Sequence, residues 1–88
     1  MKEAIINGNR IEITGIADAV GLFCPMPVVR LKLEIEKIGL NEVIELLADD
    51  PGVVEDVPAW CRDTGNECLS IEKNEEGIFA AYVKKRRN

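Results

Sequence analysis

The sequence contains no histidine, and this absence removes several kinds of chemistry. Histidine is the usual general base, a common metal ligand and the usual partner of a nucleophilic cysteine. Only three cysteines are present, without a Cys-x-x-Cys pair, which argues against a zinc site. An odd number of cysteines also argues against a disulfide framework. We therefore expect neither a metal nor a cofactor.

Long apolar runs and basic residues are also scarce. No run approaches the ~18 apolar residues of a membrane span, and residues 1–9 lack the apolar core of a signal peptide. These absences predict a cytoplasmic protein, with reduced thiols and no membrane partner. The net charge is −5, from 11 basic and 16 acidic residues. Four basic residues lie at 84–87, and we interpret residues 85–88 as a solvated basic tail on an acidic body, which argues against direct nucleic-acid binding.

Eighty-eight residues are enough for one hydrophobic core and too few for two, so residues 1–88 are expected to form a single domain. Asn7-Gly8 lies between two apolar segments and is a hairpin signal. Residues 1–9 are therefore interpreted as an N-terminal extension that forms one arm of a hairpin. The second arm is a strand over residues 10–18, in which Gly15 is expected to mark a bulge.

Two helices are expected further along the chain. The first covers residues 25–38, where apolar residues recur at helical spacing, and Gly39 is expected as its C-terminal cap. The second follows a strand over residues 43–48 and starts with Asp50 as N-cap and Pro51 at the first helical position. Pro58 predicts a kink or a break into two pieces, and Gly65 ends the helix. One apolar face of this second helix comprises Val53, Val57, Trp60, Cys61 and Thr64.

The last segment has the pattern of a hairpin with a turn at residues 74–77. Leu69 and Ile71 are expected on its apolar side, and Cys68 on its polar side with Ser70 and Glu72. The resulting order, βαβαββ, predicts an α+β fold. We expect a two-layer sandwich in which two helices cover one face of a mixed four-stranded sheet, with a further strand contributed by the N-terminal extension.

Cys24 lies where the first strand has ended and the first helix begins. The expected helix start places Cys24 at the N-cap, Pro25 at the first helical position and Pro27 at the third. The N–H groups of Met26 and Val28 are then the nearest free donors. Because these donors and the helix dipole favour negative charge, we expect the pKa of the Cys24 thiol to be lowered.

A thiolate without a base or an oxyanion site is suited to attack on sulfur and poorly suited to cleavage of peptides or esters. The chemistry that Cys24 supports is therefore sulfur-to-sulfur exchange. The alternative is a buried cysteine that only packs.

The segment Gly-Leu-Phe-Cys-Pro-Met-Pro at residues 21–27 resembles the G-L-x-C-P-x-P signature of TusA-like (SirA-like) sulfur-carrier proteins. Ala48-Asp49-Asp50-Pro51 and Pro58-Ala59-Trp60-Cys61 resemble the second-helix region of that family, and the similarity covers roughly residues 16–84. The resemblance implies a βαβαββ sandwich. It also implies that Cys24 accepts sulfane sulfur as a persulfide from a cysteine desulfurase or another persulfide donor.

In this interpretation the chain passes sulfur to a downstream acceptor protein, for example in tRNA thiolation or cofactor biosynthesis. Pro25 and Pro27 keep the geometry of the helix N-terminus next to Cys24. It is a sulfurtransferase in the sense of a persulfide carrier. Two other readings stay open: a non-covalent regulatory or RNA-associated binding module, and a thiol-redox protein that pairs Cys24 with Cys61 or Cys68. Cys61 is otherwise expected to be a core residue, and Asp49-Asp50 a helix cap in preference to a cation site.

Overall fold

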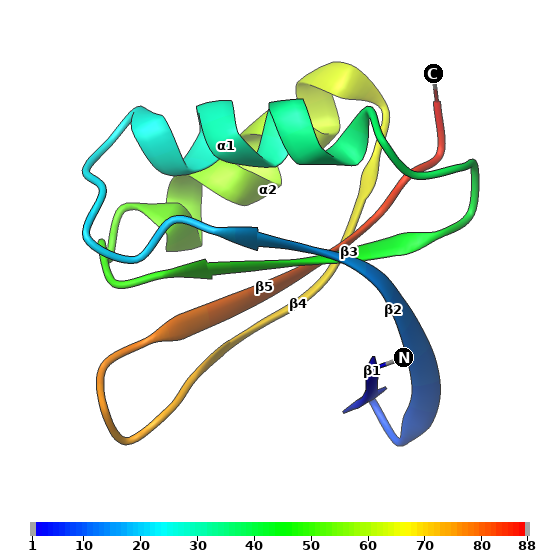
Figure 1. Cartoon of the computed structure of the whole chain (residues 1–88), viewed down its shortest axis with the longest axis horizontal. Helices are drawn as coiled ribbons and strands as arrows, with labels where there is room; N and C mark the ends of the chain where they lie inside the picture. Colours follow the sequence, from blue (N-terminus) through cyan, green and yellow to red (C-terminus); the bar gives the residue numbers. More distant parts are fainter. Residues whose placement is uncertain (1, 88) are drawn as a thin grey trace.

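Two helices cover one face of a five-stranded sheet in the computed structural model, which describes residues 2–87 (Figure 1). The order of elements agrees with the order read from the sequence, and the N-terminal extension contributes a full strand. The elements are β1 (Lys2–Ile6), β2 (Asn9–Asp18), α1 (Met26–Ile35), β3 (Val43–Ala48), α2 (Val53–Thr64), β4 (Glu67–Lys73) and β5 (Phe79–Lys84).

The sheet is mixed, as expected, with spatial order β1-β2-β3-β5-β4. β2 and β3 are parallel because α1 crosses over between them, whereas β3/β5, β5/β4 and β1/β2 are antiparallel. The parallel register shifts between Ile13 and Gly15, which confirms the bulge expected at this glycine. The carboxyl ends of β2 and β3 therefore lie at one edge of the sheet.

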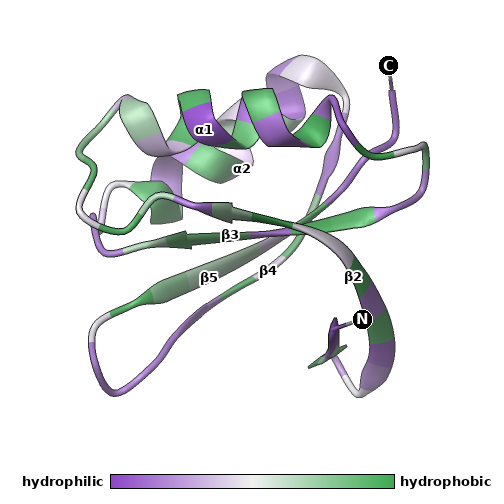
Figure 2. Cartoon of the chain, in the orientation of Figure 1, coloured by the Kyte–Doolittle hydropathy of each residue, from purple (hydrophilic) through white to green (hydrophobic). Residues whose placement is uncertain are grey.

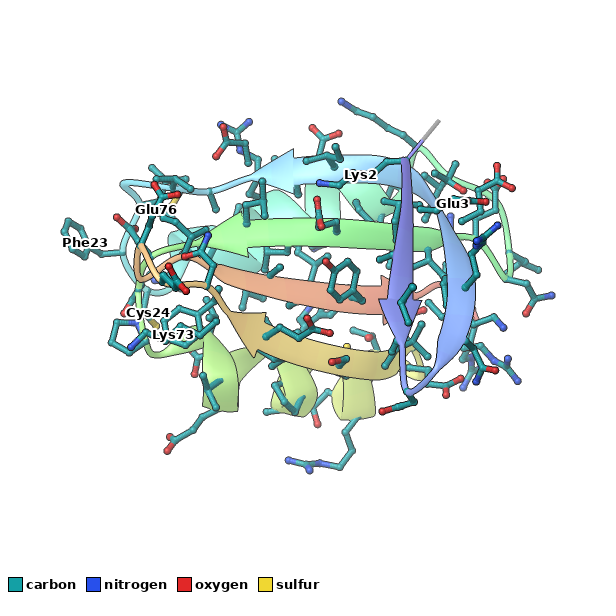
Figure 3. All side chains as sticks on the ribbon, turned by 90° about the horizontal axis from the view of Figure 1, so that it is seen from below. Lys2, Glu3, Phe23, Cys24, Lys73 and Glu76 are labelled. Atoms are coloured by element: carbon teal, nitrogen blue, oxygen red, sulfur yellow. The ribbon has the colours of Figure 1, made fainter. Side chains whose placement is uncertain are left out.

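The N-terminal hairpin folds onto the face of the sheet that the helices leave open. Asn7 and Gly8 both have positive φ angles, 53° and 80°, as a two-residue hairpin turn requires. Figure 3 shows β1 lying across this open face. Lys2 Nζ lies 2.6 Å from a carboxylate oxygen of Glu45 on β3, and the Tyr82 hydroxyl on β5 donates a hydrogen bond to the other oxygen at 2.8 Å. Glu45 is only 2% exposed, so its charge is buried with the Tyr82 hydroxyl, whereas Lys2 reaches it from an exposed position.

The main core lies between the helices and the sheet. Hydrophobic and hydrophilic segments alternate along α1 and β2 (Figure 2), which is the pattern of elements with one buried face. The buried residues of this main core include Leu31 and Ile35 from α1, Val53, Val57 and Cys61 from α2, and Ile44, Leu46, Ala81 and Val83 from the sheet. Trp60, the single tryptophan of the chain, packs half-buried against this core. The apolar stripes predicted for both helices are confirmed, except that Thr64 at the end of α2 is exposed.

The ends of α1 differ from the prediction. Pro25 has ψ of 11°, outside helical values, so it is the N-cap residue and the helix begins at Met26. At the other end the helix stops at Ile35. Ile38 still packs in the core, but from a turn in which its N–H bonds the carbonyl of Ile35. Gly39 does not adopt a positive φ, and its N–H donates to the Glu42 carboxylate.

α2 starts two residues later than expected, at Val53, with Gly52 as N-cap. It runs through Pro58 as one continuous helix, so the alternative of two short pieces is wrong. Its end agrees with the prediction: Gly65 has a φ of 81°, and the N–H groups of Gly65 and Asn66 both donate to the carbonyl of Cys61. The helix thus ends at Gly65, one turn after Cys61.

The predicted faces of β4 were partly wrong because the strand contains a bulge. The antiparallel register with β5 shifts between Cys68 and Ser70. This shift reverses the alternation of side chains within the strand. Cys68 and Ile71 consequently pack against the helix-side core, whereas Leu69 packs against the cluster under the N-terminal hairpin.

Arg86 and Arg87 are exposed, as expected for a solvated tail, but Lys85 is not. Lys85 is buried, its Nζ donates to the carbonyl of Ile38 at 2.7 Å, and its backbone bonds Asn41 and Glu42. The N–H of Arg86 donates to the side chain of Asn66. The burial of Lys85 was not predicted because its partners are brought to it by the fold. Asn88 lies outside the described residues. Among residues 2–87, no helix is long and apolar enough to cross a membrane.

Candidate functional site

Cys24 lies on the loop between β2 and α1, at the edge of the sheet where the parallel strands end. The thiol-bearing residue is exposed, and so is the neighbouring Phe23, which is 76% exposed. Figure 3 shows Phe23 projecting away from the body of the molecule and Cys24 beside it at the same end. The alternative of a buried packing cysteine at this position is therefore wrong.

Two consecutive carboxylates at the end of β3 hold this loop. The N–H of Gly21 donates to Asp49 at 2.9 Å, and the N–H of Cys24 donates to Asp50 Oδ2 at 2.8 Å. The other oxygen of Asp50 accepts the N–H of Gly52 at 3.1 Å, just before α2. Asp50 is therefore not the N-cap expected from the sequence, because Gly52 occupies that position; its carboxylate instead joins the N–H just before α2 to the backbone of Cys24.

A third carboxylate contacts the thiol itself. Cys24 Sγ donates a hydrogen bond to Asp56 Oδ2, 3.1 Å away, in the first turn of α2. This hydrogen bond raises the pKa of the Cys24 thiol above its ordinary value, with smaller contributions from desolvation and from the charges of Asp56 and Asp50. In the free protein the Cys24 side chain is therefore held as a thiol.

The lowered pKa expected for Cys24 is wrong for a structural reason. The prediction rested on free N–H donors at the start of α1, with Cys24 at the cap. The helix begins one residue later, and the N–H of Met26 donates to the carbonyl of Phe23 at 2.8 Å. The charges that reach the sulfur are instead those of Asp56 and Asp50.

The two prolines stand one position earlier relative to the helix than expected. Pro25 is the exposed N-cap residue and is joined to Cys24 by a cis peptide bond. Pro27 occupies the second helical position, where it interrupts no helical hydrogen bond, and its ring is fully buried. Pro27 therefore anchors the first turn of α1 in the core, on the helix that follows the cysteine.

Exposed apolar side chains occur on the segments around the thiol. Val20, Phe23 and Met26 come from the Cys24 loop and the start of α1, and Val54 comes from the first turn of α2, near Asp56. Together with Asp56 and Glu55 they give the site both apolar and acidic character. Such a combination suits a protein partner better than a small hydrophilic substrate.

The other two cysteines interact with each other. Cys61 is buried on α2, as expected for a core residue, and its side chain hydrogen-bonds Cys68 on β4. Cys24, in contrast, has carboxylates as its partners. The structure therefore gives no support to the reading that pairs Cys24 with either of them in a redox dithiol.

Sequence reasoning missed the role of Asp56. Its position on the polar side of the second helix gave no signal, because its contact with Cys24 spans 32 residues of sequence. Asp49 and Asp50 were singled out, but for capping alone. Within residues 2–87, no group of three or more acidic or cysteine side chains is placed to hold a metal ion.

The sequence of this chain is similar to those of a known protein family. Residues 16–85 match the family described as Sulfurtransferase TusA. A putative sulfur carrier protein from Archaeoglobus fulgidus is 40% identical over 67 residues, covering 76% of this chain and 87% of the relative. The sulfur carrier protein TusA of Pseudomonas savastanoi pv. phaseolicola is 34% identical over 86 residues, covering 98% of each chain.

A solved structure supports the same fold. The crystal structure of a SirA-like protein from Desulfitobacterium hafniense superimposes with a TM-score of 0.73 and covers 84% of this chain and 100% of that one. The sequence identity is 20%, so the likeness concerns the architecture alone. The two-layer α+β sandwich predicted from the sequence is confirmed.

Proposed function

Because this chain belongs to the Sulfurtransferase TusA family, we propose that it is a sulfur carrier in which Cys24 holds sulfane sulfur as a persulfide. The observation that carries the proposal is the exposed thiol of Cys24, presented on a loop that Asp49 and Asp50 fix by backbone hydrogen bonds. A reactive sulfur that must pass between two proteins needs both access and a defined position.

The two transfer steps are thiol exchange reactions. The Cys24 thiolate attacks the terminal sulfur of a donor persulfide, a new S–S bond forms, and the donor's S–S bond breaks. The donor thiolate leaves and receives the proton that Cys24 gave up, so no external oxidant or reductant is needed. An acceptor then attacks the terminal sulfur of Cys24-S-SH in the same manner and restores the Cys24 thiol.

Asp56 gives this reaction a dependence on the partner. The carboxylate keeps Cys24 protonated in the free protein, which makes the thiol a poor nucleophile. A cationic group of the docked donor that pairs with Asp56 or Asp50 weakens this effect and favours the thiolate. We therefore expect the carrier to be activated when a basic partner docks.

The partners we propose are a cysteine desulfurase or another persulfide donor, and a downstream acceptor in tRNA thiolation or cofactor biosynthesis in the cytoplasm. The exposed Phe23 and Met26 would contact an apolar part of the partner, next to its basic groups. Pro25 and Pro27 would keep the loop and first helical turn in place during the exchange. The chain acts here as a carrier, and its partners supply further acids, bases and specificity.

The proposal is tested by loading the protein with sulfur. After incubation with a cysteine desulfurase and cysteine, mass spectrometry without reductant should find one added sulfur atom on the tryptic peptide 11–30, which contains Cys24. Cys24→Ala should abolish the added mass, and Cys68→Ala should retain it as a matched control. Sulfur found on Cys61 or Cys68 alone, or equal loading of Cys24→Ala, would contradict the proposal.

A further inference from the structure

Cys61 and Cys68 are brought together by the turn that joins α2 to β4. Cys61 lies in the last turns of α2 and is 2% exposed, whereas Cys68 is the second residue of β4 and is half-buried. Two N–H groups, those of Gly65 and Asn66, converge on the carbonyl of Cys61 at 2.9 and 3.0 Å. The reversal is therefore fixed by the backbone, and it places the start of β4 against the end of α2.

The bulge in β4 completes the arrangement. With regular alternation from Ser70 and Glu72, Cys68 would lie on the polar side of the strand. The register shift between Cys68 and Ser70 instead turns Cys68 toward the helices, where it packs against the cluster that contains Cys61. Hydrogen bonding between the two thiols shifts their pKa values in opposite directions, so the two side chains lie next to each other in this cluster.

The hydrogen bond gives the two thiols different properties. The bond to Cys68, followed by desolvation, raises the pKa of Cys61, so its sulfur stays protonated. The same bond stabilises the Cys68 thiolate and, with a backbone contribution from Ser70, lowers the pKa of Cys68 to about 7 against the opposing effect of desolvation. One sulfur is thus a nucleophile at neutral pH, and the other is its buried neighbour.

We propose that Cys61 and Cys68 form an oxidation site, in which a small disulfide or a related two-electron oxidant converts the thiol pair into an intramolecular disulfide. The Cys68 thiolate attacks a disulfide RSSR, forms the mixed disulfide Cys68-S-S-R and releases RS⁻. Cys61 then attacks the Cys68 sulfur, the S–S bond between Cys68 and the SR group breaks, and the second RS⁻ leaves as RSH with the Cys61 proton. Both protein thiols are oxidised, RSSR is reduced to two thiols, and Cys24 takes no part.

This site is separate from the proposed sulfur carrier function, because it uses neither Cys24 nor its carboxylates. It also explains a feature that packing alone does not require, namely a half-exposed cysteine in contact with a buried one. A disulfide between them would connect the last turns of α2 to β4 across a loop of six residues, 62–67.

The experiment is oxidation of the whole chain with oxidised glutathione, followed by alkylation and mass spectrometry. The expected product has lost two hydrogen atoms, and trypsin, which cuts after Arg62, should give peptide 38–62 linked to peptide 63–73. Cys24→Ser should give the same link. The rate should rise with pH through about 7, as the Cys68 thiolate forms.

Cys68→Ser is the primary negative variant, since Cys68 is half-exposed and its replacement leaves the core in place. It should remove the linked peptides, and Cys61→Ala should leave glutathione attached to Cys68. Three results would overturn the proposal: a link that includes peptide 11–30, a wild-type protein that ends as a stable glutathione adduct at Cys68, or one that retains three free thiols under conditions that oxidise a model dithiol.

Discussion

Cys24 and Asp56 together determine how the candidate site responds to pH. The carboxylate accepts the S–H hydrogen bond and opposes formation of a second negative charge 3.1 Å away. Since a thiol with a raised pKa ionises only at higher pH, Cys24 should react slowly at neutral pH although it is exposed. Low intrinsic reactivity protects a carrier thiol from unwanted alkylation and oxidation between transfers.

Asp56→Asn should make Cys24 more reactive. The substitution removes both the charge and the best hydrogen-bond acceptor for the thiol, so the pKa of Cys24 falls and iodoacetamide should modify it several-fold faster at pH 7. Glu55→Gln removes a charge from the same turn without changing the Asp56 contact, and is the matched control. Measurement of the alkylation rate from pH 6 to 10 gives the pKa directly; identical profiles for Asp56→Asn and the wild type would refute this role of Asp56.

At the scale of elements, most of the architecture could be predicted from the sequence. Helical spacing of apolar residues, the Asn7-Gly8 turn and the helix stop at Gly65 are local signals, and each agreed with the structure. The error in the faces of β4 arose because a distant contact decides the outcome. The bulge in β4 is fixed by pairing with β5, and no pattern within residues 67–73 reveals it.

For the candidate site as well, local features could be predicted from the sequence and features that depend on distant contacts could not. The position of Cys24 on an exposed loop before a helix could be predicted, because the two prolines mark the corner. Its electrostatics could not, because Asp50 and Asp56 lie 26 and 32 residues away in sequence. From the sequence we expected only the modest effect of a helix dipole on Cys24. In the folded chain, Asp50 accepts the N–H of Cys24 and Asp56 accepts its S–H.

The hydrogen bond from Tyr82 on β5 to the buried Glu45 on β3 leads to a prediction at this scale. Desolvation and the hydrogen bond to Glu45 raise the pKa of Tyr82 above its ordinary value. A group whose pKa is higher in the folded state contributes stability below its unfolded pKa of about 10, and this contribution is lost as the pH rises further. The free energy of unfolding should therefore fall above about pH 10.

Tyr82→Phe tests this contribution. It should lower stability at pH 7 by about 1–2 kcal/mol, because the buried Glu45 carboxylate loses one of its two hydrogen-bond partners. It should also give a shallower loss of stability above pH 10, as measured by urea unfolding at several pH values. Parallel curves for the two proteins at high pH would show that Tyr82 does not contribute to the alkaline loss.

At the scale of the whole molecule, charge is distributed unevenly. The chain has a net charge of −5. Its basic residues Lys85, Arg86 and Arg87 lie together in the segment that follows β5, where Lys85 is buried and the backbone N–H groups of the two arginines donate to Asn66. Several carboxylates lie instead at the end of the sheet that carries Cys24. A basic partner would be attracted to that end from a distance.

Sulfur transfer from a basic protein donor should therefore slow as salt increases, since the Debye length shrinks from about 30 Å at 0.01 M to about 10 Å at 0.1 M. The measurement is the initial rate of Cys24 loading by a desulfurase across that range. Loading by a small uncharged persulfide is the control and should not change. A donor reaction equally insensitive to salt would exclude electrostatic attraction as part of docking.

Trp60 offers a direct way to observe these events. It is the single tryptophan of the chain, lies half-buried on α2, follows Asp56 by one helical turn and immediately precedes Cys61. Its fluorescence therefore reports on one helix whose first turn contacts the Cys24 thiol and whose last turns hold Cys61. Quenching or a spectral shift can follow partner docking and thiol oxidation in real time, in the native chain and without an attached dye.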